Sequence, residues 1–282
     1  MHFIVTTDRS EHSYRAFPHA ARIASAAGAE LTLLQVLNPR LDLASEVDPS
    51  LSAAAERVAV RWQTELEAVA RSHDLAATST VAIQQQRERT DDTVARVAGE
   101  REAALLIMDT RGSGKVHHTL VGSVATGVVG KSGLPVMLTR EGMASPRDSA
   151  RYRLLVTHDG SPAADAILLT LRPLLPTLGA EVTMLRAHEL PAADSREIRK
   201  GFEDLRAAFS LGANVTMRLE PLHGERSAAD AILAVAAEIG ADAIAMATHG
   251  HSARRHLFAG STAMDVLGRS AVPVIMAKAG AA

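Results

Sequence analysis

The sequence contains no cysteine, and only 3% of its residues are aromatic. The absence of cysteine excludes disulfide bonds and thiolate metal sites, and it fits the cytoplasm, where thiols stay reduced. The scarcity of aromatic side chains argues against a surface that stacks the bases of a nucleic acid. We therefore expect a cytoplasmic protein that does not have nucleic acid as a partner.

The chain also lacks a strong net charge and a long apolar run. Its formal net charge is -2, which supplies no attraction to nucleic-acid phosphates or to an anionic membrane surface. No segment reaches the ~20 apolar residues of a membrane-spanning helix, and the opening MHFIVTTDRS turns polar too soon for a signal peptide. With 282 residues, 47% of them hydrophobic, the chain can bury a large core. These features predict a soluble globular protein without a membrane partner.

What the sequence does contain is the same pattern twice. Residues 105–138 align with residues 243–276 over 34 positions without a gap, and 12 of these positions are identical. Residues 3–13 (FIVTTDRSEHS) likewise parallel residues 154–164 (LLVTHDGSPAA). Two matching beginnings and two matching ends indicate a tandem duplication of one domain, with a period too long for a solenoid.

The duplication predicts both the domain boundaries and the fold. We expect a first domain at 1–140, a polar linker at 141–152 and a second domain at 153–282. The expected strands lie at 3–7, 31–37, 78–84, 103–108 and 136–140, and at 154–158, 182–188, 214–220, 243–246 and 274–278. The first helix of each half is expected at 12–27 and at 162–178. Apolar strands that alternate with helices predict an α/β fold, with an open five-stranded, mostly parallel sheet flanked by helices in each domain.

One connection draws attention because it joins a strand to a helix through glycines. The segment THGHSARRHLFAGSTAMDVL, residues 248–267, leaves the fourth strand of the second half and enters a helix expected to start at Ser261. Ligands of open parallel sheets bind beyond the carboxyl ends of the strands, and helix N-termini attract anions. Gly250 and Gly260 can adopt a positive φ, and Ser261 or Thr262 can cap the helix or bond a phosphate. The alternative is an ordinary turn, because two glycines are weak evidence.

Asp8 and Asp159 each end the first strand of their half, and a serine follows each of them two positions later. Such an aspartate can cap the next helix. It can also accept a hydrogen bond from an adenine amine or from a sugar hydroxyl. The two interpretations are compatible, because a carboxylate has two oxygens.

At these residues the chain resembles the universal stress protein family, over essentially its whole length and twice. The loop pattern of that family is Gly, two residues, Gly, nine residues, Gly, then Ser or Thr. The corresponding positions are Ala247, Gly250, Gly260 and Ser261 in the second half, and Asp109, Gly112, Gly122 and Ser123 in the first half.

The resemblance implies a Rossmann-like fold that binds ATP, with magnesium if it is bound, and it leaves a homodimer open. In ATP-binding members the adenine lies near positions that correspond to Asp8 and Val36, and to Asp159 and Ala187. The phosphates lie on the glycine loop and helix start, which correspond to Gly112, Gly122, Ser123 and Val124, and to Ala247, Gly250, Gly260, Ser261 and Thr262. The implied role is a stress-response module whose conformation or partner affinity changes with the bound nucleotide.

Both halves depart from the family pattern at its first glycine. The first half has Asp109 there, and a carboxylate repels a triphosphate in a cleft where screening is poor. The second half has Ala247, which adds only a methyl group, and Arg254 and Arg255 in its loop either reach phosphate oxygens or remain solvated surface charges. We therefore predict that the second half is the ATP site and that the first half is degenerate.

Other signals of catalysis or metal binding are incomplete. The stretch GSGK at 112–115 lacks the first glycine and the final Ser or Thr of a Walker A loop. The loop histidines have no carboxylate placed beside them by the sequence, so we assign no metal site; they are His117, His118, His249, His251 and His256. No serine has a base and an orienting group around it, so we assign no catalytic residue and expect at most slow ATP hydrolysis. The alternative function is a scaffold that binds partners and has lost the nucleotide.

Overall fold

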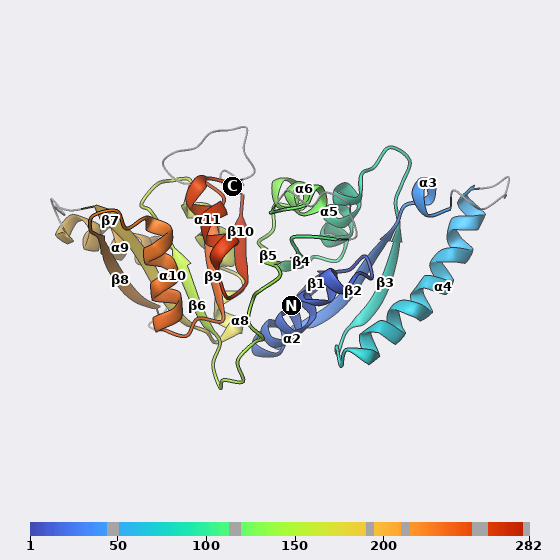
Figure 1. The fold of residues 1–282 in the computed structure, drawn as a ribbon, viewed down its shortest axis with the longest axis horizontal. Helices are drawn as coiled ribbons and strands as arrows, with labels where there is room; N and C mark the ends of the chain where they lie inside the picture. The colour runs from blue at the N-terminus through green and yellow to red at the C-terminus, as the bar shows by residue number, and fades with distance from the viewer. Residues whose placement is uncertain (44–50, 113–119, 190–194, 210–214, 250–258, 279–282) are drawn as a thin grey trace. The chain divides into compact units, whose positions relative to one another are not determined.

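The computed structural model describes residues 1–43, 51–112, 120–189, 195–209, 215–249 and 259–278 (Figure 1). The chain divides into two compact units, Met1–Glu141 and Gly142–Ala282, which we call the first and the second unit. All of the expected linker after Glu141 falls in the second unit, where the backbone N–H of Ala144 donates a hydrogen bond to the carbonyl of Ala271 (2.8 Å). Within the described ranges, no helix is both long and apolar enough to span a bilayer.

The first unit is built on a sheet of five parallel strands in the order β3-β2-β1-β4-β5. Its strands are β1 (His2–Thr6), β2 (Glu30–Leu37), β3 (Thr78–Ile83), β4 (Leu105–Asp109) and β5 (Val136–Thr139). Its helices are α1 (Glu11–Tyr14), α2 (Ala16–Ala27), α3 (Pro39–Asp42), α4 (Leu51–Ser72), α5 (Thr90–Glu100) and α6 (Ser123–Lys131).

The second unit repeats this arrangement, with the strand order β8-β7-β6-β9-β10 and all neighbouring pairs parallel. Its strands are β6 (Arg153–Thr157), β7 (Glu181–Glu189), β8 (Val215–Leu222), β9 (Ala243–Ala247) and β10 (Val274–Ala277). Its helices are α7 (Asp165–Leu171), α8 (Leu175–Leu178), α9 (Ser195–Ala208), α10 (Ala228–Glu238) and α11 (Ser261–Arg269). The predicted α/β fold with two tandem five-stranded sheets is confirmed.

Helices cover both faces of each sheet, which explains why the central strands are apolar along their length. Every residue of β4 and of β9 is buried. Right-handed crossovers place α2 and α4 on one face of the first sheet and α5 and α6 on the other (Figure 1). The order of the strands along the sheet reverses between β1 and β4. The carboxyl ends of these two strands and the N-terminus of α6 therefore lie at the same edge of the sheet.

The first helix of each unit differs from the prediction of one continuous helix. In the first unit it is divided at Arg15 into α1 and α2. In the second unit α7 begins at Asp165 instead of at residue 162, and it ends before Pro173. Proline has no backbone N–H to continue the helical hydrogen bonds, so the chain restarts as the short helix α8. The apolar pattern alone did not reveal these interruptions.

Candidate functional site

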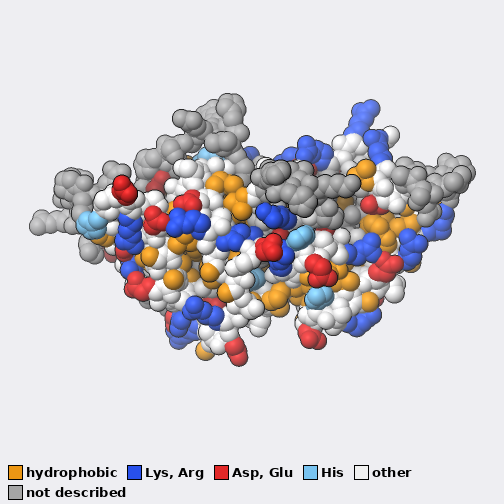
Figure 2. Space-filling model, viewed as in Figure 1, with side chains coloured by type: hydrophobic (Ala, Val, Ile, Leu, Met, Phe, Trp, Pro, Cys, Tyr) orange, Lys and Arg blue, Asp and Glu red, His pale blue; other side chains and the backbone are white. Residues whose placement is uncertain are grey.

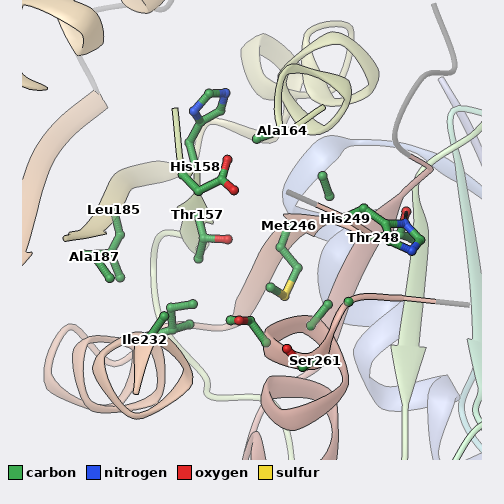
Figure 3. Close-up of a pocket in the computed structure, with 16 residues that line it drawn as sticks. Thr157, His158, Ala164, Leu185, Ala187, Ile232, Met246, Thr248, His249 and Ser261 are labelled. Atoms are coloured by element: carbon green, nitrogen blue, oxygen red, sulfur yellow. Dashed lines mark hydrogen bonds between the residues drawn. The ribbon is translucent and has the colours of Figure 1, made fainter. Parts of the chain in front are cut away.

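The second unit has a cavity of about 210 Å³ at the carboxyl ends of β6, β7 and β9 (Figure 3). The residues that the sequence singled out come together around it; those that line the cavity are Asp159, Ala187, Ala247, Gly260, Ser261 and Thr262. Gly250, Arg254 and Arg255 lie outside the described residues.

The first unit has the equivalent cavity, with a volume of about 340 Å³. The predicted residues of that half also line it, and they are Asp8, Val36, Gly112, Gly122, Ser123 and Val124. Lys115, His117 and His118 lie outside the described residues. Two units with no shared strand thus place equivalent residues around equivalent cavities.

The aspartate at the end of the first strand holds the turn that follows it. In the second unit Oδ1 of Asp159 accepts hydrogen bonds from the backbone N–H (2.9 Å) and the hydroxyl (2.6 Å) of Ser161. Asp8 makes the same pair of bonds with Ser10, at 3.0 and 2.5 Å. The serine, and not the aspartate, then accepts from the backbone N–H three residues later. The turn therefore holds each carboxylate at the rim of its cavity.

The glycine before the last helix ends a loop that returns to its own strand. The backbone N–H of Gly260 donates to the carbonyl of Thr248, and that of Gly122 donates to the carbonyl of Thr110, both at 2.7 Å. Gly260 is the N-cap residue of α11 with φ -64°, so the positive φ that glycine allows is not adopted at this position. The expected helix start at Ser261 is confirmed, and capping by this serine is excluded because it is the first helical residue.

Both cavity helices consequently begin without a side-chain cap. Neither Gly122 at α6 nor Gly260 at α11 can supply a side-chain acceptor to the first turn. The N–H groups of that turn are not satisfied within the helix and carry the positive end of its dipole. Because Gly260 and Ser261 line the cavity, the start of α11 presents an anion-binding surface to it.

The sequence reasoning missed the apolar wall of the cavity. In the second unit this wall includes Leu185 of β7, Ile232 of α10 and Met246 of β9. Figure 3 shows Met246 between Leu185 on one side and His249 on the other, with Ser261 close to the end of its side chain. Met246 lies near the carboxyl end of β9 and Leu185 lies in the middle of β7, so only Met246 could have been found from its position at the end of a predicted strand.

The sequence reasoning also missed His158, which is buried beside the cavity. Its Nδ1 accepts the backbone N–H of Gly160 (3.0 Å), so the ring proton is on Nε2, which donates to Oδ1 of Asp165 (2.9 Å). Burial lowers the pKa of His158 and outweighs the opposing effect of Asp165. Its imidazole points away from Met246 and Ser261 (Figure 3), so this neutral histidine supports the turn.

His249 is the one loop histidine from the sequence analysis that the structure describes. It lines the second cavity, and its Nδ1 lies 3.1 Å from the hydroxyl oxygen of Thr248. His251 and His256 fall outside the described residues. Within the described part of the chain, no group of three metal-ligating side chains is present.

The two cavities differ most clearly at the first position of the loop motif. Asp109 ends β4 with 5% of its surface exposed. Its Oδ1 accepts from the backbone N–H of Arg111 and its Oδ2 from the hydroxyl of Thr139, each at 3.0 Å. Burial raises the pKa of Asp109, although these hydrogen bonds and the nearby Arg15 act in the opposite direction. The equivalent residue of the second unit, Ala247, has no polar side chain.

Comparison with known proteins agrees with this description. The model of the universal stress protein family matches residues 1–140 and 151–278. A solved universal stress protein from Archaeoglobus fulgidus DSM 4304 is 25% identical, covers 99% of this chain and 96% of its own, and has a TM-score of 0.63. A functionally unknown protein from Pseudomonas aeruginosa PAO1 shares the fold at 15% identity, with coverages of 99% and 92% and a TM-score of 0.61. The search of curated proteins found no match.

Proposed function

The chain belongs to the universal stress protein family, and we propose that its second unit binds an adenine nucleotide, ATP in particular. The observation that supports this proposal is the meeting of Asp159, Ala187 and the uncapped start of α11 around one cavity. Bound ATP, with magnesium where the nucleotide carries it, would shift the conformation of the unit or its affinity for a protein partner. We place this activity in the cytoplasm and in the response to stress.

Each part of a nucleotide has a matching surface in this cavity. The apolar wall of Leu185, Ile232 and Met246 suits the faces of a purine. The carboxylate of Asp159 is an acceptor for an amine or a sugar hydroxyl. The N-terminus of α11 suits the phosphates because its N–H groups and its dipole both favour negative charge.

The geometry favours a binding module over a dedicated catalyst. Both ring nitrogens of His158 are engaged in hydrogen bonds, so this histidine can take a proton from water only by releasing Gly160. Oδ1 of Asp159 is held by Ser161. ATP hydrolysis in this cavity is therefore expected to be slow at most.

The proposal does not include nucleic acid as a partner. On the face shown in Figure 2, the described Lys and Arg side chains are interspersed with Asp and Glu. The formal net charge of the chain is -2. A surface of mixed sign does not concentrate the positive potential that binds a phosphate backbone. A homodimer of the whole chain belongs to the proposal, and sedimentation of the purified protein tests it.

The experiment that tests ATP binding is isothermal titration after any carried-over nucleotide has been removed. We expect one site per chain and its loss in Gly260→Glu, which places a carboxylate at the start of α11. Gly260→Ala is the matched control: its Cβ would lie 3.7 Å from the carbonyl oxygen of Thr248, an ordinary contact, so this variant should still bind ATP. ATP binding to Gly260→Glu with wild-type affinity would show that this loop does not hold the phosphates.

A second candidate function is a scaffold that binds protein partners without a nucleotide. The observation that favours it is the replacement of the first motif glycine in both units, by Asp109 and by Ala247. A wild-type chain that gives no heat with ATP, and that does not compete for a fluorescent ATP analogue, would support this candidate.

A further inference from the structure

The two cavities have matching walls but different charges. Leu34, Val94 and Met108 line the first cavity where Leu185, Ile232 and Met246 line the second. Three carboxylates, of Asp8, Asp42 and Asp109, line the first cavity, whereas Asp159 is the one carboxylate among the described residues of the second. The exposed Arg111 supplies a positive charge to the first cavity, but water screens it.

Asp109 is a built-in part of the first cavity. It pairs with Thr139 across the register of β4 and β5, and the hydroxyl of Thr139 donates to it. At the same register positions the second unit has Ala247 and Ala277. One unit therefore has a hydrogen-bonded polar pair where the other has two methyl groups.

The Asp109 carboxylate also takes a hydrogen bond that the loop could offer to an anion. The backbone N–H of Arg111 donates to its Oδ1 (3.0 Å). A phosphate that entered this end of the first cavity would compete with a fixed carboxylate for the loop and would be repelled by it. In the first cavity the Asp109 carboxylate thus accepts a loop hydrogen bond of the kind that a ligand phosphate would accept in the proposed ATP site.

A second and independent observation supports a ligand in the first cavity. Thr110 lines it with 1% of its surface exposed, and its hydroxyl oxygen has no hydrogen-bond partner among the described residues. Buried polar groups are nearly always paired, so such a hydroxyl marks a place for a group that completes it. In the second unit the hydroxyl oxygen of Thr248 lies 3.1 Å from a ring nitrogen of His249.

We propose that the first cavity is a separate binding site for a phosphate-free ligand of the nucleoside type, and that Asp109 excludes the corresponding nucleotide. An apolar wall receives the base, and carboxylate and hydroxyl oxygens receive its N–H and O–H donors. The volume of about 340 Å³ lies at the lower end of the range of roughly 300–1,000 Å³ for small-molecule sites. The choice of a nucleoside rests on the proposed function of the second unit, because the two walls match; the exclusion of phosphate does not.

The test uses the full chain with the second cavity filled. Ala187→Trp places a large ring in that cavity and leaves the first one as the site that is measured. Four nucleosides, adenosine, guanosine, cytidine and uridine, are titrated calorimetrically beside their 5′-triphosphates. We expect one nucleoside to bind once per chain, and its triphosphate to bind at least about 100-fold more weakly. Val36→Trp, the matched variant of the first unit, should abolish the nucleoside heat.

Two substitutions at Asp109 distinguish the effect of its charge on triphosphate binding from the effect of its size. Asp109→Ala, added to Ala187→Trp, reproduces the residue of the second unit and should bring the triphosphate to within about tenfold of its nucleoside. Asp109→Asn keeps the size and removes the charge, so it should recover much of the same gain. A triphosphate that remains excluded from both variants would overturn the role of Asp109.

Thr110→Val tests the unpartnered hydroxyl in the same background. The change should weaken the nucleoside about 5- to 10-fold, as for the loss of one hydrogen bond. It should not lower the unfolding temperature, because it removes a buried polar atom that has no described partner. Unchanged nucleoside affinity would show that this hydroxyl does not contact the ligand and would remove the second observation.

The outcomes for the two units can be told apart. If none of the four nucleosides binds to the Ala187→Trp chain, or if a triphosphate binds as tightly as its nucleoside, the proposal for the first cavity is wrong. Failure of ATP to bind to the wild-type second unit is a separate result, because that cavity is filled in the Ala187→Trp chain.

Discussion

The two units keep the same turn, loop and helix start around their cavities, while the side chains at the cavity and beneath it differ. The backbone hydrogen bonds donated by Gly122 and Gly260 have the same length of 2.7 Å, yet the position of Asp109 in the first unit is occupied by Ala247 in the second. The two units therefore share the backbone around the cavity and differ in the side chains at the first position of the loop motif.

The two units also differ in the ion pairs formed by the two helices next to the cavity, α5 and α6 in the first unit and α10 and α11 in the second. In the first unit the buried carboxylate of Asp91 on α5 pairs with Lys131 on α6 (2.6 Å). The second unit has alanine at the position of Asp91, and Asp265 on α11 pairs with Arg269 (3.0 Å). The equivalent residues Asp92 and Asp230 pair with Lys131 and Arg269, both at 2.6 Å. Each unit therefore has two carboxylates beside the cation, one at the same position in both units and one that comes from a different helix.

The largest effect on the free energy of unfolding is expected in the first unit, at His19, which is buried in α2. Burial lowers its pKa from 6.5 to about 4. Between these values the unfolded chain binds the proton and the folded chain does not, so the stabilising contribution is complete above pH 6.5 and is lost as the pH falls to 4. The loss amounts to about 3 kcal/mol in the first unit.

His19→Leu should remove this acid sensitivity. Trp62 is the single tryptophan of the chain, and it lies in the first unit, so its fluorescence follows the urea unfolding of that unit between pH 7 and pH 4. The prediction is wrong if the midpoint of the variant falls with pH as steeply as that of the wild type. His158→Thr, which changes the second unit, is the control that should leave the fluorescence transition unchanged.

The next effect concerns the exchanged carboxylates. A Cβ added at Gly127 would overlap the carboxylate of Asp91, so Gly127→Ala should destabilise the first unit by about 2 kcal/mol through overpacking. Combining Gly127→Asp with Asp91→Ala reproduces the arrangement of the second unit and should restore most of that stability. Urea unfolding followed by Trp62 fluorescence measures both variants. Equal destabilisation by the single and the double change would show that the two positions are not exchangeable.

A smaller effect is expected at the residue after the rim aspartate. Gly160 has φ 84°, and a Cβ there would lie 2.6 Å from a guanidinium nitrogen of Arg186. Gly160→Ala should therefore cost about 1 kcal/mol in calorimetric unfolding of the second unit. An unchanged transition would mean that the turn relaxes without strain.

The equivalent residue of the first unit, Arg9, has the same left-handed backbone with φ 63°. Its guanidinium lies 4.3 Å from the ring centre of Trp62 and pairs with Glu65. Arg9→Gly relieves the backbone strain but loses both contacts, so we expect a net change within about 0.5 kcal/mol. A loss of more than about 1 kcal/mol would show that the side chain dominates at this position.

Much of the fold and part of the site could be predicted from the sequence. The apolar strands were found because both faces of each parallel sheet are covered, which makes the strands apolar along their length. Asp8, Asp159 and the glycine loops were found because they follow such strands in both halves. The φ of Gly260 and the cap of α11 could not be decided from the sequence, since they depend on the hydrogen bond from that glycine to Thr248. His158 gave no signal, because its burial depends on elements that are distant in the sequence.

The duplication, the order of strands and helices and the two sets of rim and loop residues can be read from the sequence, because they follow from local periodicity and from comparison of the halves. Three features appear only in the folded chain: the hydrogen bond between Thr139 and Asp109, the buried hydroxyl of Thr110 without a partner among the described residues, and the space that Gly127 leaves for Asp91. The first and the last of these features join neighbouring strands or helices, and the second depends on the burial of a loop residue. Their energies depend on distance and desolvation in the folded chain, which no local pattern of residues records.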